Sequence, residues 1–234
     1  LSFDILPDLQ VNRSFPNGKN SHKAVMRAAQ LLCKHGVPCH FRTTISFAAS
    51  DRLQEMVEFT HRYTAVKTIR FEPMAEIGRA SDTEMNKPAQ QAFVNAFIAA
   101  YELGKQYGIM VTCKMMTNIQ RRSSRFCNVE FAVTSEGNVA GCHRYSRQNN
   151  AGFDFYHVGK WHGQQFDFDM ANINALRRID VHAFPECRNC FARWSCASGC
   201  LSARMQDGEI SQTGPLCHLT QELLKFSIKE ALNA

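Results

Sequence analysis

The first half of the chain alternates between short apolar stretches and longer stretches of helical periodicity. The short stretches have the pattern of β-strands, and strands are expected over residues 1–6, 38–45, 66–74 and 109–113. Apolar residues recur three and four positions apart in between, so helices are expected over residues 21–36, 51–63 and 88–106. This alternation predicts parallel βαβ units, and right-handed crossovers can curve three such units into part of a barrel.

Polar side chains share one face of each expected strand. These residues are Ser2 and Asp4; His40, Arg42 and Thr44; and Arg70 and Glu72, which are followed on the same face by Met74. A polar strand face of this kind is typical of a ligand site. The same residues can instead form ion pairs with one another, such as Arg70 with Glu72 or Asp4 with Arg42, and both interpretations remain open.

The composition becomes polar and basic after Cys113, and a domain boundary is expected near Thr117. Beyond it, residues 126–134 and 138–142 have the pattern of a β-hairpin, in which Gly137 provides the positive φ of the turn. A short helix is expected over 172–179, and Thr220 is expected to cap a final amphipathic helix.

Seven of the ten cysteines form a single pattern, C-x9-G-x4-C, a gap, C-x2-C-x5-C-x3-C, a second gap and a last C. Its members are Cys127, Cys142, Cys187, Cys190, Cys196, Cys200 and Cys217. Cysteine packs only as a small apolar residue, so a core does not need this density of sulfur. Two cysteines separated by two residues direct both sulfurs toward one metal centre. Seven thiolates exceed one site with four ligands and are one short of two such sites.

Three kinds of chemistry can use clustered cysteines. Zinc sites favour paired CxxC turns or mixtures of Cys and His, whereas this pattern has a single CxxC. Disulfides need an oxidising compartment, and residues 1–6 do not resemble a signal peptide. The all-thiol ligand set and its spacing favour iron–sulfur clusters over both alternatives.

The cysteine pattern resembles, position for position, the SPASM domain that ends many radical S-adenosylmethionine (radical SAM) enzymes. Short motifs in the first half resemble the later units of the radical SAM partial barrel, although Ile5 replaces the glycine of an SLDG-type strand end. These motifs are Ser2-Phe3-Asp4, Asn12-Arg13, Glu72-Pro73-Met74 and Gly78-Arg79-Ala80. The resemblance implies an α/β fold: an incomplete parallel (β/α) partial barrel over residues 1–116, then a SPASM iron–sulfur domain with a β-hairpin and a C-terminal helix over residues 117–234.

The resemblance also implies roles for individual residues. One auxiliary 4Fe–4S cluster would be held by Cys187, Cys190, Cys196 and Cys217. The other would be held by Cys127, Cys142 and Cys200, with one iron left open to another ligand. Cofactor binding in the first half would use Ser2, Asp4, Arg42, Glu72 and Met74.

His143 directly follows the second cysteine of the pattern. Sulfatase-maturing members of the family carry Asp at this position as a base, so His143 is a departure that argues against sulfatase maturation. Histidine can also act as a base near neutral pH, which makes His143 the candidate catalytic residue. The alternative is a histidine that is solvated or packs beside a cluster.

The expected activity is hydrogen abstraction from a peptide or protein, leading to a crosslink, an epimerisation or an oxidation. The sequence has no Cys-x3-Cys-x2-Cys, the motif that holds the SAM-cleaving cluster in this family. We therefore expect the C-terminal part of a longer enzyme, inactive alone, whose full-length form binds SAM and a third 4Fe–4S cluster. Its expected partners are the peptide substrate, the N-terminal half and a reductant protein. The alternative is a stand-alone iron–sulfur electron-transfer module or a zinc-stabilised peptide-binding module.

The formal net charge of +6 raises the question of nucleic acid binding. Seven bound thiolates remove seven charges and two cubane cores of about +2 each return four, which leaves roughly +3. The basic run at residues 120–125 has no interleaved aromatic residues, so no nucleic acid partner is expected. No apolar run approaches the length of a membrane span, and a cytoplasmic protein is expected.

Overall fold

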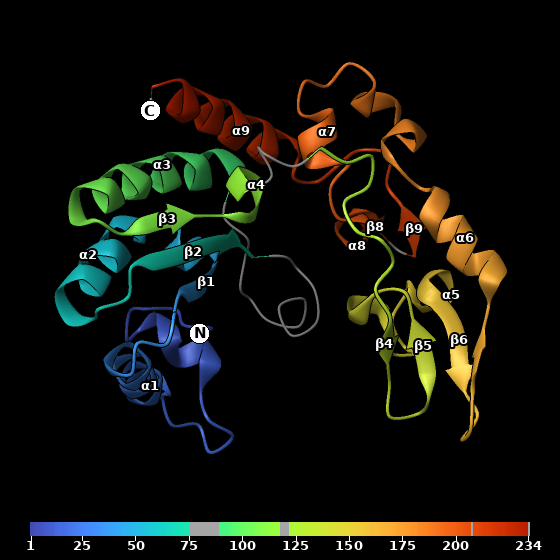
Figure 1. Cartoon of the computed structure of the whole chain (residues 1–234), viewed down its shortest axis with the longest axis horizontal. Helices are drawn as coiled ribbons and strands as arrows, with labels where there is room; N and C mark the ends of the chain where they lie inside the picture. Colours follow the sequence, from blue (N-terminus) through green and yellow to red (C-terminus); the bar gives the residue numbers. More distant parts are fainter. Residues whose placement is uncertain (75–88, 118–121, 207, 234) are drawn as a thin grey trace. The chain divides into compact units, whose positions relative to one another are not determined.

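The structure is a computed structural model that describes residues 1–74, 89–117, 122–206 and 208–233. The chain divides into two compact units, residues 1–117 and residues 118–234 (Figure 1). The expected motif Gly78-Arg79-Ala80 and the expected helix start at Pro88 lie outside the described residues.

The first unit contains a three-stranded parallel sheet with the order β1-β2-β3. Its strands are β1 (Phe41–Ile45), β2 (Thr68–Pro73) and β3 (Met110–Thr112). Its helices are α1 (His22–Lys34), α2 (Leu53–Tyr63), α3 (Gln90–Tyr107) and α4 (Lys114–Thr117), with 3-10 turns at Leu9–Arg13 and Phe47–Ala49. Figure 1 shows α3 alongside β3. The parallel α/β arrangement expected from the sequence is confirmed.

Alternate residues of the sheet are buried, as the period of a strand requires. Phe41 and Ile45 of β1 and Ile69 and Phe71 of β2 are fully buried. The residues between them form the opposite, more polar face, because paired residues of parallel strands lie on the same side. On that face Arg42 pairs with Arg70, Arg70 with Thr112, and Thr44 with Glu72.

The prediction of a strand over residues 1–6 is wrong: the only β-pairing there among the described residues is one isolated bridge between Ser2 and Arg42. The chain turns at Ile5, whose φ is 61°, and the Leu6 amide donates to the Asp4 carbonyl at 2.7 Å. Positive φ is rare for a β-branched residue. The Ile5 side chain is fully buried, so its packing holds this backbone conformation in place.

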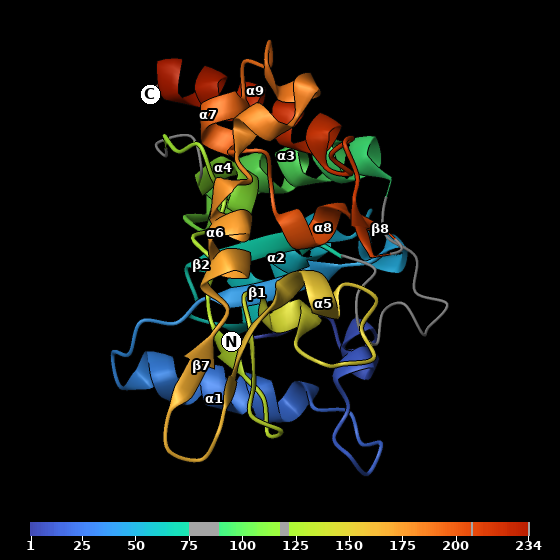
Figure 2. The same ribbon diagram turned by 90° about the vertical axis from the view of Figure 1, so that its right-hand side faces the viewer.

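The second unit contains a four-stranded antiparallel sheet with the order β4-β5-β6-β7. Its strands are β4 (Ala132–Val133), β5 (Asn138–Ala140), β6 (His157–Trp161) and β7 (Phe166–Phe168), and a small second sheet pairs β8 (Met205–Gln206) with β9 (Glu209–Ile210). Its α-helices are α5 (Phe153–Tyr156), α6 (Met170–Arg178), α7 (Arg193–Cys196), α8 (Leu201–Arg204) and α9 (Cys217–Leu232). Three 3-10 turns span His143–Tyr145, Val181–Ala183 and Pro185–Cys187. Figure 2 shows β6 and β7 as two arms of one hairpin.

Three sequence expectations for this unit need correction. Residues 126–131 are not a strand, so the first arm of the expected hairpin shortens to β4. Helix α9 begins at Cys217, and Thr220 lies buried inside it instead of capping it. Helix α6 begins at Met170, because the Asp169 carboxylate caps it by accepting from the Asn172 amide at 2.9 Å. Among the described helices, none is both long enough and apolar enough to cross a membrane.

Candidate functional site

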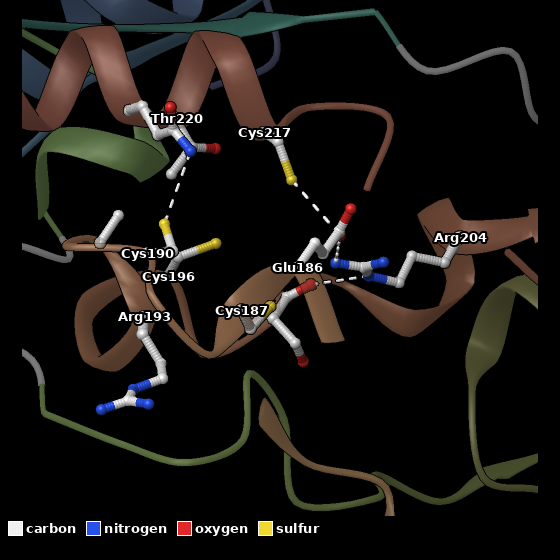
Figure 3. Close-up of a pocket in the computed structure, with 11 residues that line it drawn as sticks. Glu186, Cys187, Cys190, Arg193, Cys196, Arg204, Cys217 and Thr220 are labelled. Carbon is white, nitrogen blue, oxygen red and sulfur yellow. Dashed lines mark hydrogen bonds and ion pairs between the residues drawn. The ribbon is translucent and has the colours of Figure 1, made fainter. Parts of the chain in front are cut away.

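Four of the seven patterned cysteines line one cavity of about 100 Å³ in the second unit, as Figure 3 shows. Cys187 ends the 3-10 turn that begins at Pro185, and its carbonyl accepts from the Cys190 amide at 3.3 Å. Cys196 is the last residue of α7, and Cys217 is the first residue of α9. Neighbouring turns and one helix start therefore bring together four residues that the sequence separates by up to 30 positions.

These four cysteines, the four-cysteine pocket, are sheltered from solvent. Cys187 is buried and the other three are half-buried. Burial raises the pKa of the Cys196 thiol to about 12, with the neighbouring Cys217, Cys187 and Cys190 adding to the effect. Burial likewise raises the pKa of Cys187 and of Cys217. A bound cation would reverse this preference, because it deprotonates coordinating thiols.

A buried arginine adjoins the same cavity. Arg204 is 1% exposed, and its Nη2 forms an ion pair with Glu186 Oε1 at 2.8 Å. Its Nε donates to the Ser198 carbonyl at 2.8 Å, and its Nη1 donates to the Gln212 carbonyl at 2.8 Å. Arg204 thus joins the residue before Cys187, the turn after Cys196 and the loop that leads to Cys217.

Glu186 extends this network toward the last cysteine. Its Oε1 also accepts from the Gly214 amide at 2.9 Å and lies 3.7 Å from Cys217 Sγ. On the other side of the cavity, Gln221 Nε2 donates toward Cys190 Sγ at 3.5 Å. Hydrogen-bond donors near sulfur tune the potential of an iron–sulfur cluster, and Gln221 is such a donor at this cavity.

The other three cysteines, the three-cysteine group, lie at the ends of different segments. Cys127 is exposed and precedes β4, Cys142 follows β5, and Cys200 precedes α8. Burial raises the pKa of Cys142, and the nearby charges of Cys200 and Cys127 add to the effect, which places both of them within electrostatic range of Cys142. Cys200 Sγ is 3.0 Å from Ser202 Oγ.

The backbone between Cys196 and Cys200 does not continue the helix that carries Cys196. In a continuous helix, residues four apart would lie on the same face. Here Ala197, Ser198 and Gly199 all have positive φ, at 53°, 61° and 74°. This left-handed run ends α7 directly after Cys196, and Cys200 is not among the residues that line the pocket.

Among the described residues, no three Cys, His, Asp or Glu side chains are close enough together to hold one metal ion. A single tetrahedral ion with bonds of about 2.3 Å needs sulfurs about 3.8 Å apart. A four-iron cluster binds each sulfur at a different iron, so its ligands are spaced more widely around a larger volume. Four thiols around a cavity have the donor chemistry that such a cluster requires.

Of the two ion pairs considered for the polar face of the first unit's sheet, one is present. Arg70 Nε binds Glu72 Oε1 at 2.7 Å, so this ion pair is confirmed. Asp4 does not pair with Arg42, because its Oδ2 binds Arg13 Nε at 3.0 Å. Burial raises the pKa of Asp4 against the opposing effect of Arg13. Asp4 Oδ1 is buried and has no hydrogen-bond partner among the described residues.

The remaining expected site residues have contrasting surroundings. Ser2 and Arg42 are exposed, whereas Met74 is buried and its amide donates to the Ile45 carbonyl at 2.9 Å. His143 is exposed in the turn after Cys142, and its carbonyl accepts from Ser146 Oγ at 3.2 Å. The roles expected for these residues stay predictions.

Sequence reasoning missed Glu186, Arg204 and Tyr156, which adjoin the two cysteine groups. Glu186 directly precedes Cys187, and Arg204 lies four residues after Cys200, so proximity to the cysteines was the available signal. Nothing in the local sequence shows that Arg204 is buried, because its partners Glu186, Ser198 and Gln212 are 18, 6 and 8 positions away and reach it through folded turns and loops, which leave no periodic pattern.

No protein-family model matches the chain, and no curated protein matches it. Solved structures of anSMEcpe match all of it at 16% sequence identity. A histidine-tagged form of anSMEcpe with bound AdoMet has a TM-score of 0.70, and "Native anSMEcpe with bound AdoMet" has 0.68. "Native anSMEcpe with bound AdoMet and Cp18Cys peptide" has 0.67. The chain spans 64%, 66% and 68% of the three structures in that order. The chain therefore shares, over its whole length, the fold of part of anSMEcpe, a radical SAM/SPASM enzyme.

Proposed function

We propose that this chain is part of a radical SAM/SPASM enzyme that modifies a peptide or protein, and that its seven patterned cysteines hold two auxiliary 4Fe–4S clusters. The observation that carries the proposal is the cavity lined by Cys187, Cys190, Cys196 and Cys217. The fold shared with anSMEcpe supports the general class.

The second unit supplies the ligands and the charges for the clusters. When bound, each cluster supplies one-electron transfer. The guanidinium of Arg204 provides a buried positive charge beside the four-cysteine pocket, where anionic thiolates would gather. Arg204 and Glu186 also hold the pocket's segments in place before any metal binds.

The first unit contributes a polar sheet face to SAM binding. Ser2, Asp4, Arg42, Glu72 and Met74 are the proposed contacts. Asp4 supports this assignment, because a buried carboxylate oxygen without a partner has an unmet capacity to accept hydrogen bonds. A ligand with hydroxyl or ammonium donors would satisfy it.

The proposed substrate is a peptide, in line with the anSMEcpe structures that contain the Cp18Cys and Kp18Cys peptides. Only three cysteines belong to the second group, so one iron of its cluster would remain open to a substrate group or another ligand. His143 follows Cys142 and is exposed, which suits a proton acceptor for a bound peptide. Because His143 replaces the Asp of sulfatase-maturing members, we propose a different peptide modification.

Anaerobic reconstitution of the purified chain with ferrous iron and sulfide tests the proposal. We expect 4Fe–4S absorption and EPR spectra with no zinc retained. Zinc bound in preference to iron would contradict it and favour a zinc-stabilised module.

A second assay concerns SAM cleavage. The reduced chain should produce no 5′-deoxyadenosine from SAM, because the sequence has no Cys-x3-Cys-x2-Cys. Detection of 5′-deoxyadenosine above a boiled control would show that one of the two cysteine groups holds the SAM-cleaving cluster, against the roles proposed here.

A further inference from the structure

Tyr156, the last residue of α5, has a buried hydroxyl with no hydrogen-bond partner among the described residues. The side chain is 4% exposed and belongs to a core cluster with Val139, Val158, Ile173 and Leu176. A buried hydroxyl without a partner destabilises the fold relative to one that is satisfied. Phenylalanine would fill the same space without that cost, so the hydroxyl at this position calls for an explanation.

Part of the three-cysteine group lies in the same core region as Tyr156. Cys142 packs against the core cluster that contains Tyr156, and the Gly141 amide donates to the Tyr156 carbonyl at 2.7 Å. Tyr145 stacks on Tyr156, with ring centroids 5.1 Å apart and an interplanar angle of 13°. The Tyr156 phenol is therefore a hydrogen-bond donor within the same core cluster that Cys142 packs against.

Tyr145 provides a contrast within the same pair of rings. Its hydroxyl donates to the Ser202 carbonyl at 3.2 Å, so the protein itself satisfies this donor. Ser202 Oγ in turn accepts from Arg144 Nη1 at 3.2 Å and lies beside Cys200 Sγ. Of the two stacked tyrosines beside the three-cysteine group, only Tyr156 has a hydroxyl without an acceptor among the described residues.

We propose that the Tyr156 hydroxyl donates a hydrogen bond to a sulfur atom of the cluster held by Cys127, Cys142 and Cys200. The inference rests on the proposed function, because the acceptor is the cluster at this site. A hydrogen bond to sulfur stabilises the additional negative charge of the reduced cluster, so it raises the reduction potential. Tyr156 would tune the reduction potential of the cluster without being one of its ligands.

The test compares Tyr156→Phe with Tyr145→Phe in the reconstituted chain, by redox titration followed by EPR. A hydrogen bond of ordinary net strength predicts that Tyr156→Phe lowers the ratio of reduced to oxidised three-cysteine cluster by about threefold to tenfold at a fixed potential. For a one-electron couple this is a shift of about 30–60 mV to lower potential. The cluster of the four-cysteine pocket should keep its potential and serves as an internal control.

Thermal unfolding of the metal-free chain separates this role from simple packing. Tyr156→Phe should leave the melting temperature unchanged or raise it, because the lost hydroxyl has no protein partner among the described residues. Tyr145→Phe should lower it, because the bond to Ser202 is lost. A melting temperature lowered by Tyr156→Phe would overturn the inference by showing that the hydroxyl has a partner within the protein.

Two results with the reconstituted chain would also overturn the inference. One is an unchanged potential in Tyr156→Phe. The other is a tyrosinate-to-iron absorption band that disappears in Tyr156→Phe, since it would make the residue an iron ligand instead of a donor. Failure of the proposed function looks different, because the wild-type chain would then hold no cluster at the three-cysteine group before any variant is made.

Discussion

The four-cysteine pocket and the three-cysteine group lie in the same unit but differ in how the protein completes them. The pocket borders a cavity, none of its cysteines is exposed, and Arg204 and Glu186 bind its segments together. The three-cysteine group has the exposed Cys127 and, beside it, a buried hydroxyl without a partner among the described residues. The protein's own side chains therefore tie the segments of the pocket together, whereas the described residues around the three-cysteine group leave a buried polar group unsatisfied.

Loss of one ligand from each site should give the largest effects. Metal binding at structural sites contributes folding free energy on the order of 10 kcal/mol. Cys196→Ala should therefore remove one cluster and much of the stability that the pocket provides. Cys127→Ala should remove the other cluster with a smaller loss of stability, because Cys127 is exposed. Iron analysis and anaerobic thermal unfolding measure both effects.

Cys33→Ala is the matched control for these variants, because Cys33 lies in α1, outside both groups. It should retain the full iron content. Equal iron content and equal melting temperatures in Cys196→Ala and the wild-type chain would contradict the assignment of the pocket.

Removal of the buried charge should have the next largest effect. Arg204→Met leaves Glu186 without its ionic partner and removes the donors to Ser198 and Gln212. Hydrogen bonds to a charged group contribute about 1.5–3 kcal/mol each, and because Glu186 is partly solvent-exposed the variant should lose about 2–3 kcal/mol of stability, measurable by urea unfolding of the metal-free chain. Arg52→Met breaks the solvent-accessible pairs to Asp8 and Glu55 and should cost no more than about 1 kcal/mol per pair. Equal losses in the two variants would show that Arg204 does not organise the pocket.

The cysteines could be recognised from the sequence because their ligand spacing is local. The Arg204–Glu186 pair could not, since it joins residues 18 positions apart through tertiary folding. The parallel strands and their helices followed from periodicity, but the strand expected over 1–6 failed at Ile5, whose conformation depends on buried packing. Strands β6 and β7 were missed because they carry exposed aromatic residues, including Trp161, Phe166 and Phe168, where alternation of apolar and polar positions is weak.

The smallest effect should come from the left-handed connector, the positive-φ residues 197–199 between Cys196 and Cys200. Left-handed backbone costs about 1–2 kcal/mol at a residue with a Cβ, so Ala197→Gly should stabilise the metal-free chain by up to about 1 kcal/mol. Gly199→Ala should destabilise it by a similar amount, because an added Cβ meets only Cys196 Sγ, at 4.0 Å, and the cost is conformational. Urea unfolding measures both changes, and effects of the same sign in the two variants would contradict the left-handed connector.

The most direct test of two separate clusters is the iron and sulfide stoichiometry of the anaerobically reconstituted chain, with Mössbauer spectroscopy to identify the cluster type. Two clusters predict about eight iron atoms per chain, four at each group of cysteines. Cys196→Ala and Cys127→Ala should each retain about four, from different clusters. About four iron atoms in the wild-type chain, all lost in either variant, would contradict the account, because a single cluster would then be shared by both groups.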